Sequence, residues 1–190
     1  MPKLIDEGRV FTAVLEVFVT KGYAGSGTKE IARLAGVNEA TLFRRYGSKA
    51  ELVVAAARAH LREVPLRELR ATGELEQDLL LIVEAYLETN ARVGAVIPVL
   101  LVEAARHPEL APALQTVWEN LSPMLGIIER HQASGALQRE SPLATMAALI
   151  GPLLAMGMFR QANPGQSLFD ADAQHHVRCF LQGRAGSSGP

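Results

Sequence analysis

The sequence contains one cysteine, Cys179, one tryptophan, and few aromatic residues, 5% of 190. A single cysteine excludes a disulfide within the chain and any cysteine-based zinc finger, and it favours a reducing compartment. The first ten residues contain no apolar stretch of signal-peptide length, so we expect a cytoplasmic, soluble protein. The longest apolar run, Met146 to Phe159, is interrupted by two glycines and a proline, which suits a buried helix better than a membrane span.

Motifs that are typical of enzymes are also missing. The chain has no HExxH pair, no glycine-rich phosphate loop after a strand, and no GxSxG elbow. His175 and His176 are adjacent and would diverge by about 100° on a helix, so they cannot hold one metal ion together. We expect the other histidines, His60, His107 and His131, to be solvated or to cap helices. The sequence therefore predicts a protein that is not an enzyme and that uses no metal or cofactor.

Charge is nearly balanced over the whole chain, with 19 basic and 20 acidic residues, which argues against a general nucleic-acid binder. The distribution is uneven, however. Residues 1–50 carry a net charge of +3 and the remainder carries −4. A basic N-terminal part on an acidic body fits a protein whose phosphate-facing surface is confined to one end.

Apolar residues recur at a helical period along nearly the whole chain, and no segment alternates as a half-buried strand would. The pattern predicts an all-α fold. In the N-terminal part we expect a first helix that buries Val10, Val14, Val17 and Phe18 and ends near Lys21 and Gly22. Further helices are expected at about 28–35, 39–46, 48–62, 74–92, 95–106, 109–133, 142–161 and 170–182.

Residues 22–52 read GYAGSGTKEIARLAGVNEATLFRRYGSKAEL, which is two short helices joined by a glycine turn and followed by a further helix start. Gly36 can adopt the left-handed conformation at the end of the first of these helices, and Asn38 can cap the next. Ser48 and Glu51 form a capping box. Because Val37, Leu42 and Tyr46 are expected to face inward, the other side of 39–46 is left for the major groove of DNA.

The run T-K-E-I-A-x-x-A-G-V-N-x-A-T-L-F-x-x-Y-x-S-K-x-E-L resembles the DNA-binding head of the tetracycline-repressor-like (TetR) family of bacterial transcriptional regulators. The resemblance covers roughly residues 5–60. It implies an all-α homodimer whose two heads bind a palindromic double-stranded DNA operator, and whose C-terminal helical domain dimerises and holds a small effector. We accordingly divide the chain into a helix-turn-helix domain at 1–47, an effector-binding and dimerisation domain at 48–183, and a flexible tail at 184–190.

The resemblance also assigns the DNA-contacting positions. It makes Lys29, Glu39, Ala40 and Arg44 the candidate base readers, and it makes the following residues the candidate phosphate contacts: Thr28, Thr41, Phe43, Arg45 and Lys49. The chain departs from the family pattern at Phe43, where a tyrosine hydroxyl is usual, and at Gly27, where serine or threonine is common.

Each of these assignments has a structural alternative. Glu39 is also a favourable first-turn residue that would repel phosphate instead of reading cytosine. Arg44 and Arg45 could form an ordinary solvated face, although their position beside the turn and Lys49 favours phosphate binding. Phe43 could pack on a neighbouring helix.

The body of the chain is expected to serve two purposes. Segment 142–161 is rich in small and flexible residues, which favours close helix approach in a homodimer formed with 170–182, and the alternative is an ordinary intramolecular core. The central helices supply a candidate pocket for a largely apolar effector, with Tyr86, Asn90, Glu103, Trp118 and Met124 as its candidate residues. Core filling is the alternative for each of the large side chains.

These features predict a ligand-responsive transcriptional regulator, in which a repressor is released from its operator when an effector moves the helix that begins at Ser48. Activation instead of repression stays open. One alternative is a helical small-molecule-binding or interaction protein whose head does not bind DNA. A second is a repressor of another helix-turn-helix family.

Overall fold

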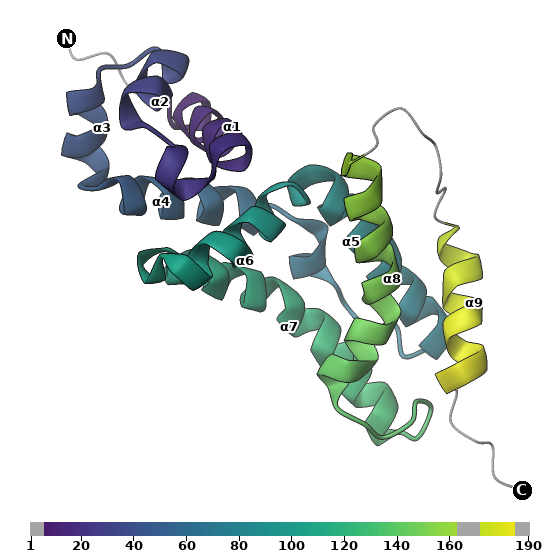
Figure 1. Cartoon of the computed structure of the whole chain (residues 1–190). Coiled ribbons are helices and arrows are strands. Elements are labelled where there is room, and N and C mark those ends of the chain that lie inside the picture. Colours follow the sequence, from purple (N-terminus) through teal and green to yellow (C-terminus); the bar gives the residue numbers. More distant parts are fainter. Residues whose placement is uncertain (1–5, 163–171, 185–190) are drawn as a thin grey trace, which may run out of the picture. The chain divides into compact units, whose positions relative to one another are not determined.

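The computed structural model describes residues 6–162 and 172–184, and no described residue belongs to a β-strand (Figure 1). This confirms the predicted all-α class. The elements are α1 Glu7–Gly25, α2 Thr28–Ala35, α3 Glu39–Tyr46, α4 Lys49–Arg62, η1 Pro65–Glu68, α5 Leu75–Val93, α6 Val96–Arg106, η2 Pro108–Leu110, α7 Ala111–Ala133, α8 Pro142–Ala162 and α9 Ala173–Arg184. Of the tail predicted at 184–190, Arg184 belongs to α9 and the rest lies outside the described residues.

The described residues form two compact units. The first contains the chain up to Glu63 together with Val93–Trp118, and the second contains Val64–Arg92 together with the described residues from Glu119 onward. The head, α1 to α3, therefore shares a unit with α4 and α6. The functional boundaries at 47 and 183 stay predictions, because compactness does not test what each part does.

The core of the first unit is formed by the apolar stripe that the sequence predicted on α1. Val10, Val14, Val17 and Phe18 are buried, α1 contacts α2 and α4, and α3 contacts both of these helices. The buried side chains of α2 to α4 are Ile31, Ala32, Ala35, Leu42, Leu52, Val53, Ala56, Ala57 and Leu61. A single stripe with a period near 3.6 residues can contact several helices because it faces one direction along its whole length. Burial of these side chains fixes the positions of α2 and α3.

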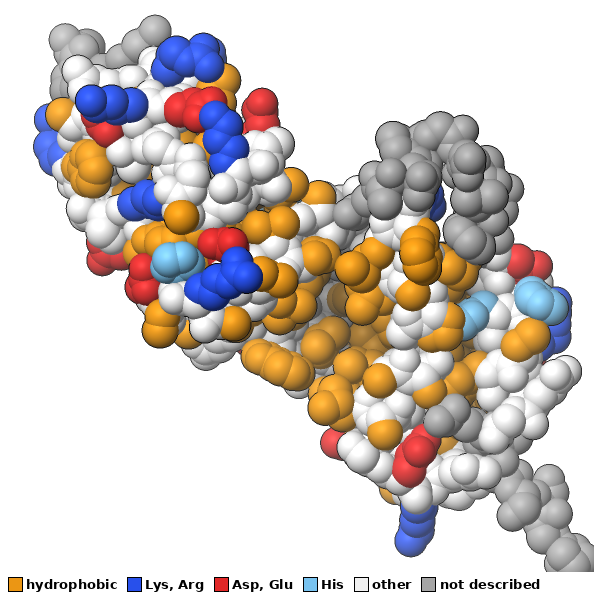
Figure 2. All heavy atoms as spheres, viewed as in Figure 1, with side chains coloured by type: hydrophobic (Ala, Val, Ile, Leu, Met, Phe, Trp, Pro, Cys, Tyr) orange, Lys and Arg blue, Asp and Glu red, His pale blue; other side chains and the backbone are white. Residues whose placement is uncertain are grey.

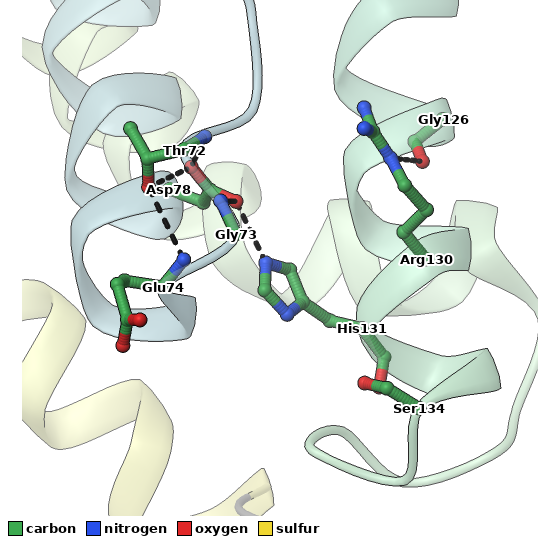
Figure 3. A network of polar contacts seen from close by, with 8 residues as sticks. All are labelled: Thr72, Gly73, Glu74, Asp78, Gly126, Arg130, His131 and Ser134. Atoms are coloured by element: carbon green, nitrogen blue, oxygen red, sulfur yellow. Dashed lines mark hydrogen bonds and ion pairs between the residues drawn. The ribbon is translucent and has the colours of Figure 1, made fainter.

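The second unit contains a buried polar network around Asp78 of α5 (Figure 3). The Asp78 carboxylate accepts hydrogen bonds from the Thr72 N–H at 2.6 Å, the Thr72 hydroxyl at 2.7 Å and the Gly73 N–H at 3.2 Å. Its Oδ2 lies 2.8 Å from Nε2 of His131 at the end of α7. His131 is only 6% exposed, so the expectation that it is solvated is wrong. The network joins the loop before α5 to the last turn of α7.

α8 exposes apolar side chains along a stretch without charged residues. Between Pro142 and Phe159 the sequence carries no charged residue, and Leu143, Leu154 and Met158 are 46%, 42% and 53% exposed. Figure 2 shows hydrophobic side chains along this helix in orange. Leu149, Ile150 and Leu153 of the same helix are buried. By length and composition alone, Pro142–Arg160 could cross a membrane.

Candidate nucleic-acid interface

The turn between α2 and α3 has the geometry that its sequence predicts. Gly36 adopts φ 69° and ψ 33°, a left-handed conformation that glycine accepts without a Cβ clash. The Val37 N–H then donates to the Ala32 carbonyl at 3.0 Å, which closes the end of α2. The Asn38 side-chain oxygen accepts from the Ala40 N–H at 2.9 Å and caps α3. The predicted left-handed glycine and asparagine cap are both confirmed.

The start of α4 and the start of α2 differ in how they are capped. The Ser48 hydroxyl oxygen accepts from the Glu51 N–H at 3.1 Å, as the capping box predicts. The reciprocal contact is made by the Ser48 hydroxyl itself, which donates to the Glu51 carboxylate at 3.0 Å. The N-cap of α2 is Gly27, which has no side chain. No side-chain oxygen at the N-cap therefore accepts a hydrogen bond from the first N–H groups of α2.

The outer face of α3 presents most of the predicted DNA-contacting side chains. Leu42 is buried and anchors the helix, and Val37 and Tyr46 are half-buried. On the other side Ala40, Phe43 and Arg44 are exposed, and Glu39 and Thr41 are half-buried. Phe43 is 45% exposed, so it is not packed into the head. Its ring therefore lies on the same face as the predicted base readers, without the hydroxyl that could bind a phosphate.

The cations of the interface fall into two groups. Arg45 donates from Nε and from a terminal nitrogen to the Glu7 carboxylate of α1, at 3.0 and 2.5 Å, and this partner raises the pKa of the guanidinium. The Lys49 ammonium lies 4.4 Å from the centre of the Tyr23 ring and 3.3 Å from the Ala24 carbonyl oxygen. Both cations already have protein partners, which compete with a phosphate for them.

Lys29 and Arg44 form the second group. Both side chains are exposed, and no acidic side chain of the described residues lies within ion-pair distance of either. Figure 2 shows Lys and Arg side chains in blue over this first unit. Exposed cations without a carboxylate partner contribute fully to the local positive potential. Among the four predicted DNA-contacting cations, Lys29 and Arg44 are therefore the two without an acidic or aromatic protein partner in the described part of the chain.

Thr28 and Glu39, assigned to different roles by the sequence, contact one another. The Thr28 hydroxyl donates to the Glu39 carboxylate across 2.6 Å. Thr28 is the first residue of α2 and Glu39 is the first residue of α3, so this bond joins the two helix starts. No local pattern predicts this pairing, because eleven positions separate the two residues.

A break in α1 connects the head to α6. Gly22 adopts φ 68° and ψ −179°, which interrupts the helix one turn before its end at Gly25. The Tyr23 N–H, freed by the break, donates to the Glu103 carboxylate of α6 at 3.0 Å. A Cβ at Gly22 would lie 3.1 Å from the same carboxylate. The His107 ring packs 4.7 Å from the Tyr23 ring, centre to centre. Glu103 thus positions the end of α1.

We expect Glu103→Ala to lower the free energy of unfolding by about 1–3 kcal/mol, because it leaves the Tyr23 N–H without an acceptor in a partly buried place. Glu103→Gln keeps an acceptor oxygen and should retain most of the stability. Glu16→Ala is the matched control, since Glu16 is an exposed carboxylate of α1. Urea unfolding at one protomer concentration measures all three. Equal stability of the Glu103→Ala and Glu16→Ala variants would contradict this role of Glu103.

The five predicted effector residues do not share one environment. Tyr86, Asn90 and Met124 lie in the second unit, where Met124 is buried and Tyr86 and Asn90 are half-buried. Glu103 and Trp118 lie in the first unit, and Trp118 is 57% exposed. Glu103 is engaged by α1 as described above. Their effector-binding role stays a prediction.

Two family comparisons match most of the chain. Residues 11–56 match the bacterial regulatory proteins of the tetR family, and residues 69–178 match the tetracyclin repressor-like C-terminal domain. The chain belongs to the TetR family. This is a family of bacterial regulatory proteins, and the relatives are named as transcriptional regulators and not as enzymes, which agrees with the sequence prediction.

The relatives of the regulator are named as HTH-type transcriptional regulators or activators. It is 34% identical over 91 residues to the HTH-type transcriptional activator FasR of Mycolicibacterium smegmatis, an alignment that covers 46% of this chain and 42% of FasR. The chain spans about half the length of the first relatives it matches. It is 28% identical over 171 residues to an HTH-type transcriptional regulator of Mycobacterium tuberculosis, covering 87% and 86% of the two chains.

Solved structures share the fold of the regulator. A transcriptional regulator from Rhodococcus sp. Rha1 has a TM-score of 0.71 at 19% identity, covering 94% of this chain and 97% of that one. The flavonoid-responsive regulator FrrA has a TM-score of 0.65 at 19% identity, covering 96% and 98%. At these identities the likeness establishes the fold alone.

Proposed function

We propose that the regulator is a repressor that binds a palindromic DNA operator as a homodimer and is released by a small, largely apolar effector. The observation that carries the proposal is the outer face of α3. The helix is anchored through buried Leu42 and presents small and apolar side chains outward. Arg44 on α3 and Lys29 at the start of α2 are exposed beside these side chains. A helix presented in this way fits the major groove, and cations beside it meet phosphates.

The apolar face of α8 supports the homodimer. A contiguous exposed apolar surface on a globular protein marks an interaction site. A second copy of this chain fits it, because an isologous interface needs only one self-complementary patch, and the small residues between the large ones allow close helix approach. Two heads related by a two-fold axis can read half-sites about 34–36 Å apart, which a single head cannot do.

The effector is expected to meet the face of α5 that carries Tyr86, Thr89 and Asn90. The Tyr86 and Thr89 hydroxyls are buried and have no hydrogen-bond partner among the described residues. Burial raises the pKa of Tyr86 to about 12, so its hydroxyl stays protonated and can donate. An apolar molecule with an oxygen acceptor would satisfy these groups. FrrA is named for its response to flavonoids, which are molecules of this general kind.

Release from DNA requires that the effector change the position or mobility of the heads. The helix that the sequence singled out, α4, is in contact with α1 and α3. α6 provides a second route, because Glu103 holds the end of α1 and α6 follows α5 directly in the chain. An effector that binds the DNA-incompetent arrangement more tightly would weaken operator binding by about 1–3 kcal/mol. The same coupling could support activation, the activity for which FasR is named.

The proposal is tested by Arg44→Ala with a duplex enriched by the purified wild-type chain from a random library. We expect weaker binding and a slope of log affinity against log salt that is smaller by about 1.8, because the homodimer loses one phosphate contact from each of its two heads. Arg45→Ala should change both less, since Glu7 already neutralises Arg45. Arg70→Ala, at an exposed position of the second unit, is the control.

Two outcomes would count against the proposal. The first is a wild-type chain that enriches no duplex at low salt. The second is an Arg44→Ala variant whose affinity and salt slope equal those of Arg70→Ala. Either result would favour a helical small-molecule-binding protein whose head does not bind DNA.

A further inference from the structure

The hydrogen bond between Thr28 and Glu39 bears on which bases the head can accept. The bond is short, 2.6 Å, and joins a neutral hydroxyl to a carboxylate. A hydroxyl has one hydrogen to donate, and here that hydrogen is used by Glu39. Hydrogen bonds to ionised acceptors are stronger than neutral ones, so Thr28 restrains the Glu39 side chain. A flexible acidic side chain at the start of α3 is thereby ordered before any DNA arrives.

Only one of the two carboxylate oxygens is engaged. The Thr28 hydroxyl contacts Oε1, and no other donor among the described residues lies within hydrogen-bond distance of the Glu39 carboxylate. Glu39 is also half-buried, which limits the directions in which the second oxygen can meet a partner. Oε2 is therefore available as a hydrogen-bond acceptor at the N-terminus of α3, the part of a recognition helix that contacts base edges.

A carboxylate can only accept hydrogen bonds, and this restricts the bases that it tolerates. Cytosine and adenine present an amino donor in the major groove, whereas guanine O6 and N7 and thymine O4 are acceptors that repel a carboxylate. Adenine places its N7 acceptor beside the amino group, and cytosine has no such neighbour. Cytosine is accordingly the base that Glu39 fits best.

Glu39 acts by rejection as much as by attraction. A negative side chain near the phosphate backbone weakens binding to every duplex, and only a base that donates to it offsets that loss. Lys29 follows Thr28 directly and places a positive charge at the same edge of the head. The cation can support affinity for DNA in general, while the carboxylate discriminates among sequences.

We propose that Thr28 and Glu39 form one specificity element, in which Thr28 positions the carboxylate and Glu39 selects cytosine at one place in each operator half-site. The inference rests on the DNA-binding function proposed above. The family resemblance assigned Thr28 to a phosphate contact and Glu39 to a base contact. The inference instead makes Thr28 a positioning residue for Glu39.

The test compares the base preference of four chains selected against the same random duplex library: wild type, Glu39→Gln, Thr28→Val and Thr28→Ser. For the wild type we expect cytosine to be preferred at one half-site position by about 5- to 150-fold over the next base. Glu39→Gln should lose this preference or move it to adenine, because an amide can donate to N7 and accept from N6. Thr28→Val, of nearly the same shape, should reduce the preference, and Thr28→Ser should restore it.

A matched variant separates base reading from a change in total charge. Glu16→Gln removes one exposed carboxylate from α1. Both glutamine variants should bind DNA more tightly overall at low salt, because each removes one negative charge. Only Glu39→Gln should change the selected base. Circular dichroism confirms that each variant is helical.

The outcomes distinguish this inference from the proposed function. If the wild-type chain enriches no sequence, the proposed function fails. If it enriches a palindrome and Glu39→Gln enriches the same base with the same preference, DNA binding stands and the specificity role of Glu39 is wrong. If Thr28→Val selects cytosine as strongly as the wild type, Thr28 does not position Glu39.

Discussion

Glutamate at both Leu154 and Met158 is expected to convert the proposed homodimer into a folded monomer and to weaken binding of a palindromic duplex by at least about 10³-fold. Both side chains are about half exposed on the apolar face of α8. In an isologous interface each substitution occurs twice, so four carboxylates would be buried against apolar surface. The loss of affinity follows because one head contacts only one half-site, and specific binding exceeds non-specific binding by about 10³–10⁷.

Sedimentation measures the oligomeric state of this double variant, and a binding titration on the selected duplex measures its affinity. Leu101→Glu is the matched control, because Leu101 of α6 is 51% exposed and lies outside α8. It should leave the mass unchanged. A wild-type chain that sediments as a monomer at the concentrations that saturate DNA would contradict the dimer. So would a wild-type chain that partitions into lipid vesicles through α8, since the face would then be occupied by lipid.

The helices of the head could be predicted because each boundary is set by residues within a few positions of it. Gly36 ends α2 with its own backbone conformation, Asn38 caps α3 through an N–H two residues ahead, and Ser48 caps α4 through an N–H three residues ahead. The outer face of α3 followed from the helical period once Leu42 was placed inside. Local chemistry of this kind is encoded in short sequence windows.

The partners of the charged side chains could not be predicted in the same way. Glu7 pairs with Arg45 across 38 positions, and Glu103 accepts from Tyr23 across 80. Such contacts depend on how the helices pack, which the period of a single helix does not specify. The resemblance assigned Lys29 and Arg44 to bases and Arg45 and Lys49 to phosphates without indicating any protein partner. The structure shows that Arg45 and Lys49 have protein partners and that Lys29 and Arg44 have no acidic one among the described residues.

The buried Asp78 network was missed for the same reason. Thr72 and Gly73 before α5 form a loop that Asp78 can reach from within its own helix, and this part has a local signal. The histidine that completes the network is 53 positions away at the end of α7. A histidine near a helix C-terminus is most often explained by the helix dipole, and only the packing of α7 shows that His131 is buried.

The largest effect on stability is expected at this network. Asp78→Ala would remove the shared partner of the Thr72 N–H, the Gly73 N–H and His131 Nε2 at a position where Asp78 and His131 are buried and Thr72 and Gly73 are exposed. Leaving a buried polar group without its hydrogen-bond partner costs about 1–3 kcal/mol, and Asp78 serves several groups at once. Asp78→Asn keeps one acceptor oxygen and should cost less. Urea unfolding at a fixed protomer concentration measures both variants, and a loss under about 1 kcal/mol for Asp78→Ala would contradict the role of the network.

The same carboxylate makes stability depend on pH. Burial alone would raise the pKa of Asp78, but the hydrogen bonds from Thr72, His131 and Gly73 outweigh it and hold the pKa below its ordinary value. A folded-state pKa below the unfolded one stabilises the fold above the unfolded pKa of about 3.9, and this contribution disappears as the pH falls through the folded pKa. The wild-type chain should therefore lose stability below about pH 4 more steeply than Asp78→Asn. Parallel acid unfolding curves for the two chains would show that the ionised carboxylate contributes nothing, because only the wild type can lose a charge at residue 78.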